Sequence, residues 1–352
     1  MSDRPKLTVI EGGKKEKQFQ DLTFDDLLDP KANGGTEIQA RKLFNNFPEL
    51  VREFNWVLSY QKIPMDPKKP SILWMHETPF DEGVRQAFKD PNYHLQFNKI
   101  VFVSYWQQQL FHALYNIPWE QSIVIGNSIE PVHVKEGDFQ VPSSRNVTKL
   151  VYISTPHRGL DILLDVIQSE EFESRFWELH VCSSFELYNR KENDVHFQKL
   201  FDRCKEDNRI KYYGTLPHDR VLSLLKESHI LAYPSTYMET SCISAMEAMS
   251  TMCAIVCPNY GALPETTANY SFSYSYEPDP ERHKVIFSHV LKDVIDNWSS
   301  NNVMQLLQYG KVYCDTFYRW DVRLQVWKQL LEGVYNLHYH GQQNPEPTPE
   351  AV

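Results

Sequence analysis

The chain has 352 residues, a formal net charge of -10 at pH 7 and 41% hydrophobic residues, which is enough for two domains with sizeable cores. The negative charge disfavours a nucleic-acid partner, because binding a phosphate backbone requires a basic surface. No apolar stretch approaches the roughly 20 residues of a membrane-spanning helix, and the polar N-terminus lacks a signal-peptide core, so we expect a cytoplasmic protein with no strong membrane signal. The six cysteines lack Cys-x-x-Cys spacing, which predicts reduced, buried thiols rather than disulfides or a zinc site.

Short apolar segments alternate with helical patterns through residues 1–129, and this alternation predicts an α/β domain with a parallel sheet. Strands are expected over residues 6–10, 55–60, 71–75, 99–103 and 122–125. Ser104 should cap a helix that ends near Tyr115.

Two positions in this first domain are candidates for ligand contact. Gly34 and Gly35 precede a helical pattern, and a Gly-rich turn lets backbone approach a phosphate or a sugar, although a simple helix-start turn is the more frequent explanation. His76 follows the strand over 71–75, at the sheet edge where open α/β proteins bind ligands. A lone histidine is nevertheless more often structural, so that alternative stays open.

Residues 130–147 are polar, contain proline and show little periodicity, which predicts an interdomain linker. A second α/β domain is expected over 148–317, followed by a C-terminal helix over 318–340 and a disordered tail over 341–352. The strands of the second domain are expected near residues 150–154, 177–182, 209–213 and 229–233. Helices are expected over 219–227, 279–298 and 303–337.

Arg158 and Gly159 lie where a helix should begin after the first strand of this domain. A cation at a helix start opposes the helix dipole, and an arginine fork can bind a pyrophosphate through two oxygens. The position therefore suggests an anionic ligand; the alternative is a solvated arginine.

The segment 229–265 is the most informative part of the chain, since it reads as strand, loop, helix, strand and loop. The loop contains Glu239, and the helix is expected from about Ser241 to Ser250. Backbone N–H groups at its start have no helical partner and could bind a phosphate. The residues concerned are Ser241, Cys242, Ile243 and Ser244.

Glu247 projects from the same helix, where its carboxylate could accept hydrogen bonds from a sugar diol. The alternative is that Ser244 and Glu247 form a capping box in a helix that only packs between strands.

Glu239 and Glu247 are separated by seven residues, and a hydrophobic strand and Gly261-x-x-Pro264-Glu265 follow them. This string resembles the donor-site signature of group 1, family 4 glycosyltransferases, which are retaining enzymes of GT-B fold. The family usually has glycine where Cys242 and Ala262 stand, and a Cβ at residue 242 narrows the approach to the donor sugar.

Other motifs are similar to this family as well. Gly126-Asn127-Ser128-Ile129 resembles the Pro-Asn-Gly-Ile crossover into the second domain, and Arg158-Gly159 fits the second of two positions that usually hold cations. Ser154 and Thr155 stand near the first, so one fixed cation is left for the diphosphate. Gly214 matches a glycine that lies against the nucleobase, although it is equally an ordinary turn residue.

The resemblance implies two Rossmann-like domains that face each other across a cleft, with the last helix returning to the first domain from about Tyr318. It implies transfer of a sugar from a nucleotide-diphosphate sugar with retention of configuration, without a cofactor or metal. The implied catalytic residues are His76, Arg158 and Glu239. The implied donor-binding residues are Gly34, Gly35, Asn127, Gly214, Ser241, Cys242, Ile243, Ser244 and Glu247.

Two alternatives are a GT-B-fold epimerase of sugar nucleotides and a non-catalytic nucleotide-sugar-binding subunit. The acceptor, whether a glycan, a lipid-linked molecule or a protein, is left open.

Overall fold

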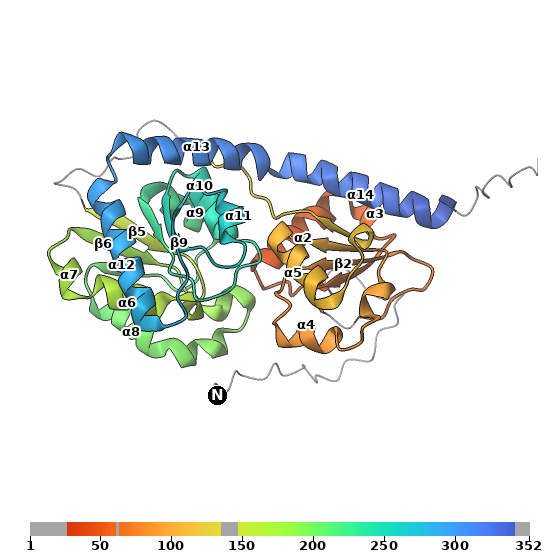
Figure 1. The fold of residues 1–352 in the computed structure, drawn as a ribbon, viewed down its shortest axis with the longest axis horizontal. Helices are drawn as coiled ribbons and strands as arrows, with labels where there is room; N and C mark the ends of the chain where they lie inside the picture. Colours follow the sequence, from red (N-terminus) through yellow and green to blue (C-terminus); the bar gives the residue numbers. More distant parts are fainter. Residues whose placement is uncertain (1–26, 61–62, 135–146, 342–352) are drawn as a thin grey trace, which may run out of the picture.

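The computed structural model describes residues 27–60, 63–134 and 147–341 (Figure 1). The strand expected over 6–10, most of the expected linker and the expected tail lie outside these residues. The described chain forms two α/β units, and each is built on a fully parallel sheet.

The first sheet has four strands in the order β1-β2-β3-β4. The strands are β1 (Asn55–Leu58), β2 (Ser71–Met75), β3 (Lys99–Phe102) and β4 (Ser122–Val124). Every residue of β2 is buried, as expected of a parallel strand that is covered on both faces. The helices and 3-10 turns of this unit are α2 (Gly35–Asn46), α3 (Pro48–Val51), α4 (Glu82–Ala87), η2 (Tyr93–Gln96), α5 (Tyr105–Tyr115) and η3 (Trp119–Gln121). The Ser104 side chain caps α5, as predicted.

The second sheet has six strands in the order β10-β9-β8-β5-β6-β7. They are β5 (Thr148–Tyr152), β6 (Trp177–Val181), β7 (Ile210–Tyr212), β8 (Ile230–Ala232), β9 (Ala254–Pro258) and β10 (Phe272–Tyr274). If β5 to β10 are numbered 1 to 6 in chain order, the strand order across the sheet is 3-2-1-4-5-6, which is the doubly wound arrangement. In this arrangement the chain turns to opposite sides of the sheet after its first and fourth strands. The switch point lies between β5 and β8.

Two groups of helices cover this sheet. One group contains α6 (Leu160–Ile167), α8 (Gln198–Glu206) and α12 (Pro280–Asn297), and the other contains α9 (His218–Glu227), α10 (Ile243–Ser250) and α13 (Asn301–Phe317). Shorter elements are η4 (Pro156–Arg158), α7 (Glu170–Glu173), η5 (Phe185–Tyr188), η6 (Lys191–Phe197) and α11 (Leu263–Thr267). The six cysteines are buried and none of them forms a disulfide bond, as predicted.

The last helix, α14 (Trp320–His340), returns to the first domain, as the resemblance implied (Figure 1). It packs against α2 and α3, and Trp327 enters the core beside Trp56 and Trp74. Tyr318 lies between α13 and α14, and its carbonyl accepts a 2.8 Å hydrogen bond from the N–H of Ile129. This bond fixes the crossover segment, which contains Ile129, at that point.

None of the helices in the described part of the chain is both long and apolar enough to cross a bilayer.

Candidate active site

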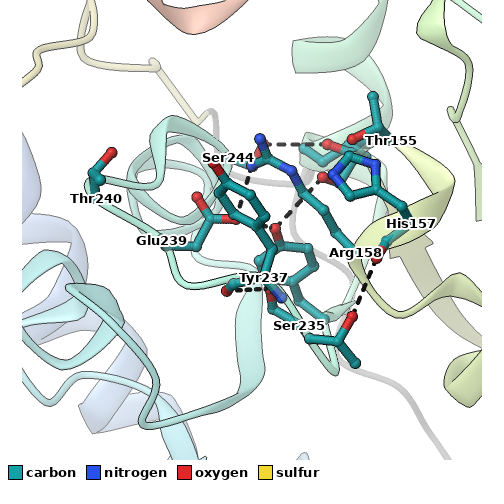
Figure 2. A network of polar contacts seen from close by, with 12 residues as sticks. Thr155, His157, Arg158, Ser235, Tyr237, Glu239, Thr240 and Ser244 are labelled. Carbon is teal, nitrogen blue, oxygen red and sulfur yellow. Dashed lines mark hydrogen bonds and ion pairs between the residues drawn. The ribbon is translucent and has the colours of Figure 1, made fainter. Parts of the chain in front are cut away.

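The candidate site lies at the switch point of the second sheet, where the loops after β5 and β8 leave adjacent strands. Such crevices at the carboxyl ends of strands are where open α/β sheets bind ligands. Figure 2 shows side chains from both loops turned toward one another, with Arg158 on the first loop and Tyr237 and Glu239 on the second.

Arg158 and Glu239 form the charged pair at the centre of this site. The Arg158 Nη1 group donates 2.8 Å to Glu239 Oε1, and the Tyr233 hydroxyl donates 2.5 Å to the same oxygen. The guanidinium also lies 4.2 Å from the centre of the Tyr237 ring. Burial alone would lower the pKa of Arg158, but the Glu239 carboxylate and the nearby phenols raise it well above its ordinary value, so the cation is permanent.

Two glycines hold this pair in position, and at both a side chain would collide with backbone. At Gly159, with φ +101°, a Cβ would overlap the carbonyl oxygen of Pro234. At Gly261, with φ +64°, a Cβ would overlap the backbone of Glu239, whose carbonyl accepts a 2.7 Å hydrogen bond from Ala262 N–H. Close packing of the loops thus fixes both charged side chains.

The first domain closes directly on these loops. The Thr240 hydroxyl donates 2.7 Å to the His76 carbonyl, so it is used between domains rather than as a helix cap. Gly34 lies against the Tyr188 ring, where a Cβ would be 2.5 Å from Cε1, and a Cβ on Gly35 would be 3.1 Å from Cδ1 of Ile243. Both glycines predicted to face the donor therefore lie at the domain interface, where they allow close approach.

Unpaired buried polar atoms gather at the carboxyl ends of the strands. Ten buried side-chain polar atoms among the described residues lack a hydrogen-bond partner, and six of them belong to loops that directly follow strands. These are His76 Nε2, Asn127 Oδ1, Thr155 Oγ1, Arg158 Nε, Ser183 Oγ and Thr215 Oγ1. A buried polar group without a partner is costly, so such a concentration at the carboxyl ends of strands in both sheets indicates a polar ligand.

His76 is one of these residues, and it is buried against Trp74 with 4.8 Å between ring centres. Burial lowers the pKa of its imidazole to about 3, so the ring is neutral at physiological pH. A neutral ring with an unpaired Nε2 can donate a hydrogen bond to a sugar hydroxyl or accept one from it. It cannot stabilise an anion by charge.

Glu77 is a further residue at the domain interface that our sequence interpretation did not identify as a candidate. Its carboxylate reaches across the interface to the Tyr237 hydroxyl, which donates 3.4 Å to Oε2. Burial and the neighbouring Asp81 raise its pKa to about 7, against the opposing effect of Arg158. The strand-end rule that pointed to His76 applies equally to the next residue and could have found it.

Replacing Glu77 with glutamine should raise stability in a pH-dependent way. Because the folded-state pKa lies above the ordinary 4.5, ionising Glu77 in the native state costs free energy; this cost is absent below pH 4.5, grows as the pH rises and is complete above pH 7. We expect Glu77→Gln to melt like the wild type at about pH 4 but about 2–4 °C higher at pH 8, by differential scanning calorimetry. Glu120→Gln, at an exposed position, is the control. An equal shift at both pH values would contradict the buried-carboxyl explanation.

The helix of the predicted phosphate site begins later than expected, at Ile243 instead of Ser241. Cys242 has extended backbone angles, φ -106° and ψ 97°, and is the N-cap residue, so Ser241 is outside the helix. The Ser244 hydroxyl donates 3.2 Å to the Ile153 carbonyl and ties the helix start to the loop after β5. The backbone N–H groups at the helix start are therefore those of Ile243 and Ser244.

The remaining predicted donor residues lie in this helix, in the loop before α9 and in the crossover between the domains. Glu247 is buried, and its Oε1 lies 2.5 Å from Nε2 of His218 at the start of α9. Gly214 adopts φ +67° in the loop between β7 and α9. Asn127 is buried in the crossover, where Gln39 binds the neighbouring Ser128 backbone through both side-chain atoms, at 2.7 and 3.0 Å.

Glu265, the last residue of the sequence signature, joins the two domains. Its two carboxylate oxygens accept hydrogen bonds of 2.8 and 2.9 Å from the N–H groups of Tyr105 and Trp106, at the start of α5. A carboxylate is favourable at a helix N-terminus, so this contact helps to hold the domains closed.

No group of three or more histidine, cysteine, aspartate or glutamate side chains suited to a metal ion occurs within residues 27–60, 63–134 and 147–341.

Parts of the chain are similar in sequence to known glycosyltransferases. Residues 140–304 match the family model described as glycosyl transferases group 1. The O-antigen chain mannosyltransferase B of Escherichia coli is 28% identical over 173 residues, which cover 47% of this chain and 43% of that protein. A phosphatidylinositol N-acetylglucosaminyltransferase subunit of Arabidopsis thaliana is 26% identical over 159 residues, covering 45% and 34%. The matches thus span less than half the length of each of these two relatives.

Solved structures share the fold over most of the chain. A glycosyltransferase from Rickettsia africae ESF-5 superposes with a TM-score of 0.62 at 13% identity, covering 93% of this chain and 84% of that one. Anabaena Alr3699/HepE, solved in complex with UDP-glucose, gives a TM-score of 0.58 at 14% identity, covering 76% and 73%. The described chain therefore has the GT-B fold of two Rossmann-like domains, and residues 140–304 match group 1 glycosyltransferases.

Proposed function

We propose that the protein is a glycosyltransferase that moves a hexosyl group from a nucleotide-diphosphate sugar to an acceptor hydroxyl with retention of configuration. The observation that carries this proposal is the permanent cation of Arg158, which is held at the switch point among unpaired buried polar atoms. The match of residues 140–304 to group 1 glycosyltransferases supports the transferase over an epimerase.

Arg158 is suited to stabilise the diphosphate leaving group. Glu239 binds only Nη1, so the guanidinium is oriented while its buried Nε keeps a free donor within the described structure. As the bond from the anomeric carbon to the diphosphate oxygen breaks, negative charge grows on the diphosphate. A fixed cation and the N–H groups of Ile243 and Ser244 would meet that charge without reorganisation.

Glu239 and His76 are suited to orient the donor sugar. Both described contacts of Glu239 use Oε1, which leaves Oε2 available to accept a hydrogen bond from a sugar hydroxyl. His76 offers its unpaired Nε2 from the opposite domain. Glu247 would bind the ribose, and the unpaired Thr155 hydroxyl would replace the first cation of the family pattern as a neutral donor.

The donor assignment is tested by thermal shift with UDP-glucose, UDP-N-acetylglucosamine, GDP-mannose, ADP-glucose and dTDP-glucose, followed by assay of nucleoside diphosphate release. We expect one nucleotide class to raise the melting temperature and to be turned over. At a hundredfold excess over Kd, the ligand should add about 2.7 kcal/mol to the free energy of unfolding. Stabilisation without release, with or without added sugar acceptors, would favour the non-catalytic binding protein. Stabilisation by none of the five would overturn the donor site.

A further inference from the structure

His218 forms a contact that neither the sequence signature nor the family match explains. It is the first residue of α9, at the end of the loop that begins with Gly214, and its Nε2 lies 2.5 Å from Oε1 of Glu247 on α10. The His218 side chain is 53% exposed, whereas that of Glu247 is 7% exposed. The imidazole therefore lies between the buried carboxylate and solvent.

We propose that His218 is a positioning residue of the donor site: it binds the Glu247 carboxylate while the site is empty and releases it when the ribose of the donor binds. This inference rests on the proposed function, in which Glu247 receives the ribose diol.

The exchange follows from the burial of Glu247. A buried carboxylate without a partner is costly, and within the described residues the hydrogen bond from His218 is the one that this carboxylate receives. A ribose hydroxyl is an equivalent donor, so it can take the place of the imidazole without leaving the carboxylate unpaired. The His218 ring can turn to water at little cost, because about half of its surface is already exposed.

The groups around His218 make this exchange sensitive to pH. The hydrogen bond that His218 donates to Glu247 raises the pKa of His218 above 6.5, burial opposes the rise, and the charges of Glu247 and of Asp219 on α9 add to it. Cys314 lies on α13, which packs against α10, and burial raises the pKa of its thiol and keeps it neutral. A donor that displaces His218 from Glu247 removes the main cause of the raised pKa, so binding should release a proton.

The sign of the effect on affinity follows from that proton release. Above the raised pKa of the free protein, His218 is neutral and donor affinity does not depend on its protonation. As the pH falls through that pKa, the imidazolium–carboxylate pair grows stronger and competes with the ribose. Donor affinity should therefore fall at acidic pH, by up to about tenfold for each pKa unit by which donor binding lowers the pKa of His218.

The test is calorimetric titration between pH 5.5 and 8.5 with whichever of the five nucleotide sugars named above stabilises the protein. Wild type is compared with His218→Gln, which keeps a donor but cannot become charged, and with His289→Gln, an exposed histidine on α12. We expect wild type and His289→Gln to lose about five- to tenfold in affinity at pH 5.5 and to release protons, seen as a buffer-dependent enthalpy. His218→Gln should show neither effect, and it should bind more tightly than wild type at pH 5.5.

A second ligand separates this role from a purely structural one. With the 2′,3′-dideoxy form of the same nucleotide, the difference in pH dependence between wild type and His218→Gln should vanish, because no diol approaches Glu247. The same pH dependence in wild type and His218→Gln would overturn the inference while leaving the donor site intact. Failure of the wild type to bind any of the five nucleotide sugars would instead overturn the proposed function on which the inference rests.

Discussion

Replacing Arg158 with alanine should lower kcat/KM for the nucleotide sugar about a thousandfold, measured as release of nucleoside diphosphate. The residue is the fixed cation at the switch point, and the residues that stand near the other cation position of the family pattern, Ser154 and Thr155, are neutral. Arg158→Lys should retain part of the activity, because lysine supplies the charge without the planar fork. Wild-type turnover in Arg158→Ala would contradict the role of Arg158 at the diphosphate.

Loss of Arg158 also leaves the Glu239 carboxylate buried without its counter-ion, which should cost about 3 kcal/mol of stability. A second variant separates the two effects. Arg158→Met combined with Glu239→Gln removes both charges and should recover most of the melting temperature without recovering turnover. If activity returned together with stability, the loss in Arg158→Ala would be one of folding alone.

Replacing Gly159 with alanine should destabilise the second domain by more than about 3 kcal/mol, or prevent folding altogether. The backbone has φ +101°, where a side chain is strained, and the new Cβ would overlap the Pro234 carbonyl oxygen in a loop that cannot move without displacing the active site. Urea unfolding followed by circular dichroism measures the change.

Two other glycines provide matched controls for Gly159. Gly214→Ala shares the positive φ, +67°, but its Cβ would meet nothing closer than 4.0 Å, so it should cost only about 1 kcal/mol. Gly333→Ala lies in α14 with open space around it and should stabilise by about 0.5–1 kcal/mol. If Gly159→Ala were as stable as Gly214→Ala, the Pro234 carbonyl would be able to move away from the new Cβ at little cost.

Local patterns in the sequence predicted the elements well where apolar segments were bounded by clear signals. The strand over 71–75 and the helix capped by Ser104 occur as expected, because a continuous apolar run and an N-cap serine are both local determinants. Strand ends differ by one or two residues where the chain enters the active-site loops.

The start of α10 could not be predicted because a contact in another domain determines it. Thr240 is as good an N-cap residue as any in the segment, yet its hydroxyl binds the His76 carbonyl across the interface. The pairings that complete the site could not be predicted for the same reason. Glu77 meets Tyr237 from the other domain, and His218 meets Glu247 from another helix, so no spacing within one element reveals either pair.

The most direct test of the donor site is hydrogen–deuterium exchange, with and without the nucleotide sugar that stabilises the protein. We expect slower exchange at the backbone amides of Ile243 and Ser244, in the loop over 153–159 and in the loop over 213–218, because the diphosphate and base would bind there. Protection confined to other parts of the chain would contradict a donor site at the switch point between β5 and β8 and would assign nucleotide binding elsewhere.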